Sequence, residues 1–275
     1  MPGPDAQTHR RENILHAMKR SCQARRGRRV LGAWLILCGL GCGRRGPTAH
    51  EAQDEYVADA AAFTNNTADD VRALLRKGPA ALTEEWEIWE HRGPMTPARI
   101  AEFYKHTSSP IFELGAWHLW RAEQRAADLA LVEDLRARYA SKTILDVGDG
   151  TGLTAIPLAR AGLDVTLADL DSNALRFGVF RAERHAVRLR SWRIGFDPAP
   201  PAPTYDVILV RDLLDPFPRD QLDAMVDQLI QRKHAGTQVI VSSPTGAAAQ
   251  HLLRLDADDH VKQLIQRLQT ELPRP

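Results

Sequence analysis

Short apolar runs alternate with amphipathic segments from residue 143 to residue 242, and this alternation limits the folds open to the chain. The runs predicted as strands are Thr143–Val147, Asp164–Ala168, Leu189–Ile194, Tyr205–Val210 and Gln238–Ser242. Helices are expected between them at 153–161, 173–185 and 219–233, with a last helix at 248–272. Strands separated by helices form parallel sheets covered on both faces. The sequence therefore predicts an α/β fold with an open, mostly parallel, doubly wound sheet of about five strands.

Three glycines follow the first predicted strand at alternate positions, in the segment Ile144–Gly152 (ILDVGDGTG). Glycine adopts positive φ readily and lets another group approach the backbone, but it loses more entropy on folding than any other residue. In an open α/β sheet, ligands bind beyond the carboxyl ends of the strands, where the strand order reverses. The turn lies at such an end, and its N–H groups with the following helix N-terminus predict a polar cradle for a cofactor.

The spacing of these glycines disfavours a dinucleotide cofactor. The dinucleotide fingerprint GxGxxG needs a third glycine where the helix packs against the strand. Counted from Gly148, that position holds Leu153, and counted from Gly150 it holds Ala155. An NAD(P)-dependent oxidoreductase is therefore the less favoured interpretation.

The segment Asp146–Gly152 instead matches DxGxGxG, and the second strand ends in an acid within VTLADLD. These motifs resemble those of the class I S-adenosylmethionine-dependent methyltransferases, over roughly residues 142–245. The resemblance implies a Rossmann-like domain in which the glycine turn passes under the amino-acid end of S-adenosylmethionine. It also implies that Asp169 accepts hydrogen bonds from both ribose hydroxyls, with Asp171 as the substitute. A carboxylate is an acceptor-only group that can take both.

The motifs and the predicted strand ends supply a set of candidate site residues. The candidates for cofactor binding are Asp146, Gly148, Asp149, Gly150, Gly152, Asp169, Leu170, Asp197 and Arg211. The candidates for the reaction are Tyr104, His118 and Asp212. Three have alternative roles: Asp146 could only brace the turn, Arg211 could face the substrate, and His118 could be a hydrogen-bonded buried histidine. Metal-ligand spacings of the HxxxH or CxxC type are missing after the leader, so no metal is expected.

The sequence departs from the family pattern after the fourth strand. The Asn-Pro-Pro-aromatic signature of amino-methylating members is absent, because the matching positions hold Arg211, Asp212, Leu213 and Leu214. Family domains normally continue past the fifth strand with a helix and an antiparallel hairpin, but about 33 residues follow Ser242. A C-terminally truncated domain is therefore expected. These departures leave open a degenerate methyltransferase fold that acts as an interaction module without catalysis.

Charge is distributed unevenly along the chain and bears on the partner. Residues 1–46 hold 10 Lys/Arg and 2 Asp/Glu, which leaves 26 and 33 in the remainder and a net charge of −7 there. An acidic body lacks the electrostatic attraction on which nucleic-acid binding depends. A small-molecule methyl acceptor is therefore expected.

Four regions are predicted along the chain: a leader (1–47), a linker or loosely helical segment (48–66), a helical preface or lid (67–140) and the Rossmann-like cofactor-binding domain (141–275). In the preface, helices are expected at 71–77, 83–91, from Thr96-Pro97 onward and at 110–140. Its tryptophans lie at helical spacing and are expected to pack in the core or lid rather than to stack on a ligand. They are Trp86, Trp89, Trp117 and Trp120.

The leader carries an arginine cluster before the apolar run Val30–Leu40, followed by small residues, which is the layout of a secretory signal. Gly41-Cys42 loosely resembles a lipoprotein cleavage site, and a start at Met18 would give such a signal its basic head, so membrane contact through the leader is one expectation. A disordered or mis-called extension is the other. All three cysteines lie in the leader, so disulfides do not hold the body together. Because S-adenosylmethionine is cytosolic, a cytoplasmic location is expected.

Overall fold

The computed structural model describes residues 48–140, 142–194, 197, 204–211, 219–242 and 259–273. The leader and Asp212 lie outside the described residues, and so does the whole region 243–258 before the last helix. Within the described ranges, none of the helices combines the length and the apolar character that crossing a membrane requires.

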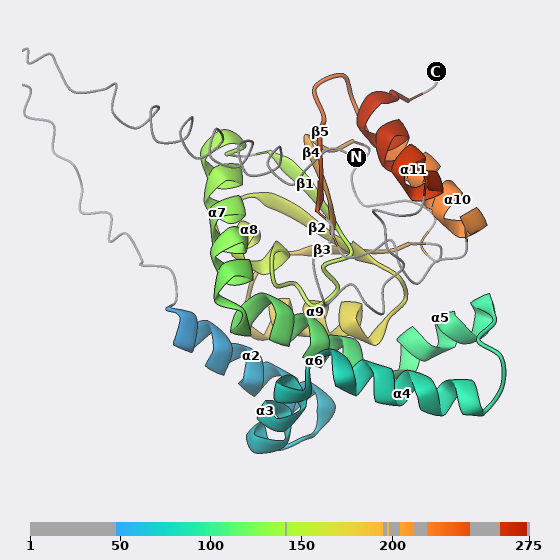
Figure 1. Ribbon diagram of the computed structural model, residues 1–275. Coiled ribbons are helices and arrows are strands. Elements are labelled where there is room, and N and C mark those ends of the chain that lie inside the picture. Colours follow the sequence, from blue (N-terminus) through green and yellow to red (C-terminus); the bar gives the residue numbers. More distant parts are fainter. Residues whose placement is uncertain are drawn as a thin grey trace, which may run out of the picture. The chain divides into compact units, whose positions relative to one another are not determined.

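Five parallel strands form one open sheet in the order β3–β2–β1–β4–β5 (Figure 1). Their bounds are β1 Thr143–Val147, β2 Asp164–Asp169, β3 Arg190–Arg193, β4 Val207–Arg211 and β5 Gln238–Ser242. The central strand β1 pairs with β2 on one side and with β4 on the other. The predicted fold class is confirmed, and the strand order reverses between β1 and β4, where sheets of this kind bind ligands.

Helices cover both faces of the sheet because successive side chains of a strand point to opposite faces. Leu145 and Val147 pack with α10 (Arg219–Ile230) and α11 (Asp259–Thr270). Ile144, which precedes Leu145 in the strand, packs with the helices on the other face. Those helices are α7 (Ala122–Arg138), α8 (Ala155–Arg160) and α9 (Asn173–Arg184). Figure 1 shows α10 and α11 on one side of the sheet and α7 and α8 on the other.

The region before the sheet is a series of helices. They are α2 (Ala49–Thr64), α3 (Ala68–Lys77), α4 (Pro79–His91), α5 (Pro97–His106), α6 (Ser109–Gly115), the π-helix η1 (Ala116–Trp120) and α7. Threonines begin three of them: the side chains of Thr48, Thr67 and Thr96 each accept a hydrogen bond from an N–H in the first turn. Gly78, at φ +53°, ends α3 where the sequence predicted a stop.

Residues 48–66 were expected to form either a linker or a loosely helical segment. The structure does not show a linker, because the helix α2 occupies most of these residues. Tyr56, Val57 and Ala60 of α2 are buried, and the Tyr56 hydroxyl donates a hydrogen bond to the carbonyl of Ile111 at 2.6 Å. The Tyr56 ring also meets Phe177 of α9 edge-on, with ring centroids 5.3 Å apart. α2 is therefore part of the folded body.

A buried ion pair ties α2 to the glycine turn. Asp59 of α2 is 1% exposed and accepts a hydrogen bond from Arg181 Nε at 3.1 Å. Arg181 Nη1 in turn donates to the carbonyl of Thr151 at 2.9 Å. Glu55, Asp59 and His185 bring their ligand atoms within 4.8 Å of one another. Arginines pair with both carboxylates, so the protein itself balances this negative charge rather than leaving it for a metal ion.

The single helix predicted over 110–140 is wrong, because the structure divides this stretch into α6, η1 and α7. The chain leaves the helical conformation at Arg121, which has extended φ and ψ values. π-Helical turns are rare and are frequently found at functional sites. Here the turn buries His118 and Leu119 while Trp120 is exposed, so one short segment faces both the interior and the surface.

Candidate functional site

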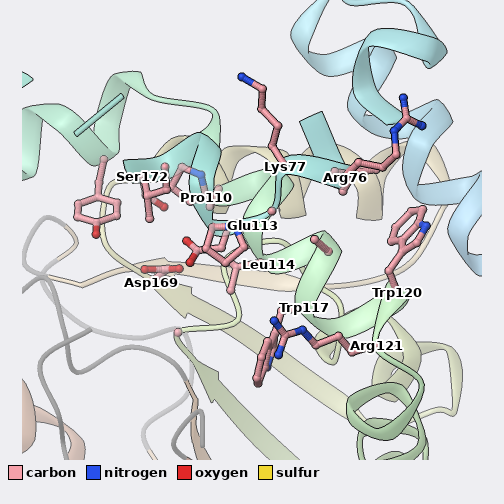
Figure 2. Close-up of a pocket in the computed structure, with 18 of the residues that line it drawn as sticks. Arg76, Lys77, Pro110, Glu113, Leu114, Trp117, Trp120, Arg121, Asp169 and Ser172 are labelled. Carbon is pink, nitrogen blue, oxygen red and sulfur yellow. The ribbon is translucent and has the colours of Figure 1, made fainter. Parts of the chain in front are cut away.

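A cavity of about 490 Å³ lies between the helical region and the carboxyl ends of β1 and β2 (Figure 2). Its size is within the range of small-molecule sites. The sheet side contributes Gly148, Asp169, Leu170, Ser172 and Ala174. The helical side contributes residues of α3, α4, α5, α6 and η1, including Tyr104, Glu113, Trp117 and Trp120. Of the predicted site residues, the cavity brings together Gly148, Asp169, Leu170 and Tyr104.

Asp169 ends β2 and presents its carboxylate to this cavity. One oxygen, Oδ1, accepts a hydrogen bond from the Leu170 N–H at 2.6 Å, and the side chain is otherwise deeply buried. Burial raises the pKa of the Asp169 carboxyl to about 7; the Leu170 N–H opposes this shift, and the charge of Asp149 adds to it. The fold therefore holds a hydrogen-bond acceptor in a poorly solvated place, which is typical of functional sites.

The three glycines of the turn all adopt left-handed φ values, 94° at Gly148, 37° at Gly150 and 72° at Gly152. Of the three, Gly148 lines the cavity. A Cβ atom on Gly150 would lie 2.5 Å from Asp169 Oδ2, and one on Gly152 would lie 3.0 Å from the Ile156 side chain. Glycine is thus needed at 150 and 152 because the chain packs against itself, and at 148 because the backbone borders the ligand space.

Gly178 of α9 was not predicted as important, yet it allows the closest approach in the site. A Cβ atom on Gly178 would lie 2.2 Å from the Gly150 carbonyl oxygen and 3.1 Å from the Gly152 nitrogen. The helix therefore packs directly against the backbone of the glycine turn. The sequence signal was a glycine inside an otherwise amphipathic helix, where it costs about 1 kcal/mol relative to alanine and needs a packing reason.

Asp149 was predicted to bind the cofactor, but the structure gives its side chain another role. Its carboxylate accepts hydrogen bonds from the N–H groups of Leu153, Thr154 and Ala155 at 3.0, 2.8 and 3.0 Å. The N-terminal N–H groups of a helix have no partner within the helix, and here the buried acid satisfies them. The predicted cradle at the helix N-terminus is therefore filled by the chain's own carboxylate.

Three other predicted residues lie away from the cavity lining or outside the described ranges. Asp146 is fully buried on β1. Asp197 accepts hydrogen bonds from the N–H and the guanidinium of Arg193, at 2.8 Å each, and Arg193 holds the pKa of Asp197 below its usual value. The structure thus gives Asp197 a role at the end of β3. Asp212 is not among the described residues.

Arg211 and His118 belong to a buried network instead of the cavity lining. Arg211 Nη2 donates to Asp128 Oδ1 at 2.6 Å, and His118 Nδ1 lies 2.7 Å from Asp128 Oδ2. Arg211 Nη1 also donates to the Thr154 hydroxyl. Although burial disfavours its charge, His118 and Arg211 hold the pKa of Asp128 below its usual value. His118 is thus the hydrogen-bonded buried histidine of the alternative, and the network joins η1, α7 and β4 to α8.

The tryptophans divide into two pairs. Trp86 and Trp89 meet Phe103 edge-on, with ring centroids 5.1 and 5.5 Å apart, so the packing role expected for them is confirmed. Trp117 and Trp120 line the cavity from the helical region, and whether they stack on a ligand stays a prediction. Their position depends on the π-helix, which the sequence pattern did not indicate.

Comparison with protein families gives a match over the second half of the chain. The model of a methyltransferase-domain family matches residues 119–273, more than half of the chain. Comparison with curated proteins gives no match.

Three solved structures are among those that match part of the chain. TehB from Haemophilus influenzae is 20% identical, with TM-score 0.36, and the match covers 41% of this chain and 39% of that one. Magnesium protoporphyrin IX methyltransferase from Synechocystis PCC 6803, with bound SAM, is 17% identical, with TM-score 0.40 and coverage of 50% and 71%. Precorrin-6y C5,15-methyltransferase from Geobacter metallireducens GS-15 is 13% identical, with TM-score 0.40 and coverage of 55% and 72%.

The matched residues 119–273 contain the whole sheet, the glycine turn and Asp169. Because that match extends over more than half of the chain, the chain belongs to the methyltransferase-domain family, and the resemblance of its motifs to the class I S-adenosylmethionine-dependent methyltransferases is confirmed.

Proposed function

We propose that the protein transfers a methyl group from S-adenosylmethionine to a small-molecule acceptor. The observation that carries this proposal is the shared cavity, which the Gly148 backbone and the Asp169 carboxylate border together. A deeply buried acid that opens only onto a ligand-sized space suits a ligand with hydroxyl donors. Apolar side chains, Leu114 and Leu170 among them, also line the cavity and reduce the water around its occupants.

S-adenosylmethionine would supply an electrophilic methyl group on a sulfonium. Asp169 would hold the donor by accepting hydrogen bonds from the two ribose hydroxyls, and Gly148 would border its amino-acid end. The chain's main contribution to rate would be orientation, because holding two reactants in line in a dry site removes most of the entropic cost of their encounter. Tyr104 and Glu113 line the cavity and can exchange a proton with an acceptor that must lose one.

Neither alternative function receives comparable support. An interaction module without catalysis would not need an open cavity with an acid of raised pKa, and the cavity here holds such an acid. An oxidoreductase would need the third glycine of the dinucleotide motif, and Leu153 occupies that place.

Calorimetric titration of the full chain tests the proposal. S-adenosylmethionine and S-adenosylhomocysteine are expected to bind with dissociation constants between roughly 1 μM and 1 mM, the ordinary range for enzyme substrates. NADH is expected to give no heat. Binding of NADH alone would establish the oxidoreductase, and silence with all three ligands would leave the interaction module.

We also propose a cytoplasmic location, because the donor is a cytosolic metabolite. The protein carrying a C-terminal tag is expected in the soluble fraction of disrupted cells. Recovery of an acylated form that requires detergent would contradict this location and assign an anchoring role to Cys42 in the leader.

A further inference from the structure

The cavity has two ends of opposite character. Figure 2 shows Asp169 and Ser172 on one side and Arg76, Trp120 and Arg121 on the other. The first end carries the acid that suits the ribose of the donor. The second end joins aromatic and basic side chains from α3, η1 and the residue after it. Since the donor's reactive methyl must face the part of the cavity that the donor leaves open, the second end is where the acceptor would lie.

Arg121 is held in a position from which its guanidinium can bind a carboxylate or a phosphate. Its guanidinium carbon lies 4.0 Å from the centroid of the Trp117 ring, a stacking arrangement that fixes the plane of the guanidinium. A stacked guanidinium keeps its N–H groups in plane at the edge, where they can bind an oxyanion in a bidentate manner. In the part of the chain that the structure describes, neither Arg121 nor Arg76 forms an ion pair with a carboxylate.

The other basic residue at this end is less suitable. Lys77 Nζ pairs with Glu84 at 2.8 Å and is half exposed, so a surface carboxylate already satisfies it. Arg76 and Arg121 are therefore the groups at this end whose charge is available to a ligand.

The walls beside these arginines suit an apolar, planar body. Leu75, Pro79 and Leu82 line the cavity from α3 and α4, the elements that also carry Arg76 and its neighbours. Trp120 is 40% exposed, one of a few large apolar side chains in the described residues that remain open to solvent. An indole has a large flat face that stacks on other aromatic rings, and covering it with a ligand ring would remove apolar surface from water.

From these features we propose that the methyl acceptor has a planar apolar body and one acidic group, which Arg121 and Arg76 bind while Trp117 and Trp120 contact the ring. This inference rests on the proposed function, because it places the acceptor beside the donor. An acid held at the arginine end would orient the acceptor so that its far edge faces the donor's methyl group.

The experiment uses two probes of equal shape, 2-naphthoate and its neutral amide 2-naphthamide, titrated into the full chain saturated with S-adenosylhomocysteine. The acid is expected to bind at least about tenfold more tightly than the amide, because charge-assisted hydrogen bonds to a guanidinium are stronger than neutral ones. Arg121→Ala is expected to remove most of this difference, Arg121→Lys to restore part of it, and Arg76→Ala to reduce it about threefold. Binding of S-adenosylhomocysteine should stay within twofold in all three variants.

Arg136→Ala is the matched control, since Arg136 is an exposed arginine of α7 that pairs with Glu133 away from the cavity. It should leave both probes unaffected. Equal binding of acid and amide, or no binding of the acid, overturns the proposal. A loss of S-adenosylhomocysteine affinity in Arg121→Ala also overturns it, because the guanidinium would then hold the donor's own carboxylate. Titrating the probes without S-adenosylhomocysteine separates the acceptor site from donor binding. If the protein binds no donor but still binds the acid more tightly than the amide, the proposed function is contradicted and the acceptor site is not.

Discussion

Asp169→Asn is expected to weaken binding of S-adenosylhomocysteine by about 100-fold. The substitution keeps the size of the side chain and an oxygen for the Leu170 N–H, but it removes the charge and one of the two acceptor oxygens. Hydrogen bonds to a charged group contribute about 1.5–3 kcal/mol each, and two ribose hydroxyls depend on this carboxylate. Calorimetry with the full chain at pH 8 measures the change.

The same substitution is expected to stabilise the free protein at pH 8. The pKa of Asp169 is raised to about 7 in the fold, above its value in the unfolded chain. At a pH between these two pKa values, the carboxyl therefore keeps its proton in the folded state and loses it in the unfolded state. The stability contributed by the neutral carboxyl is present below pH 4 and lost as the pH rises through 7. Removing the charge should therefore raise the free energy of unfolding by on the order of 2–4 kcal/mol at pH 8 and by little at pH 4.

Donor binding by the unsubstituted protein should follow the opposite trend with pH. The ionised carboxylate accepts both hydrogen bonds, so S-adenosylhomocysteine should bind about tenfold more weakly at pH 6 than at pH 8. Asp171→Asn is the control, since Asp171 pairs with Lys105 and Arg176 near the surface. It should leave donor affinity within twofold. If Asp171→Asn weakens binding as much as Asp169→Asn, the ribose is held by the wrong acid in our proposal.

Gly178→Ala is expected to lower the free energy of unfolding by roughly 3 kcal/mol, which corresponds to a fall in Tm of about 6–12 °C. The added methyl carbon would meet the Gly150 carbonyl oxygen at 2.2 Å and Leu167 Cδ2 at 2.8 Å. The first contact is with backbone, which cannot move as a side chain can, so α9 must shift away from the glycine turn. Donor affinity should fall with it, because Gly148 belongs to the same turn. Thermal unfolding and calorimetry measure the two losses.

Gly236→Ala is the matched control for the glycine substitution. Its new methyl carbon would meet only the ring of His234, at 3.2 Å, and this partly exposed side chain can shift by a few tenths of an ångström. A change of less than about 0.5 kcal/mol is expected, as for other surface substitutions. If Gly178→Ala and Gly236→Ala lower the free energy of unfolding equally, the close approach of α9 to the glycine turn is not what requires glycine at 178.

The sheet could be predicted from the sequence because its signals are local. β1 and β5 begin and end where the apolar runs indicated, and proline, threonine and glycine marked the ends of α3 and α5. α2 was less clear because its buried face includes Asp59 and small alanines, so the helix shows little apolar periodicity. The partner that makes Asp59 acceptable in the core is Arg181, more than a hundred residues later.

The sequence predicted where the site lies better than it predicted which residues pair with one another there. The motif placed Gly148, Asp169 and Leu170 at the cavity, since strand ends meet at one edge of a parallel sheet. Arg211 also leaves a strand at that edge, but its charge pairs with Asp128 of α7, a contact between residues far apart in sequence. Asp149 was equally ambiguous, because an acid after a strand can bind a ligand or cap the next helix.

The ion pair between Asp59 and Arg181 makes α2 part of the same folded body as the sheet. The family match starts at residue 119, so the match alone would place the start of the domain there. Yet the guanidinium that steadies the Thr151 carbonyl takes its counter-charge from α2, some sixty residues upstream of that point. The matched domain and the folded body are thus different lengths of chain, and any exchange of the N-terminal helices would have to supply an acid that can pair with Arg181.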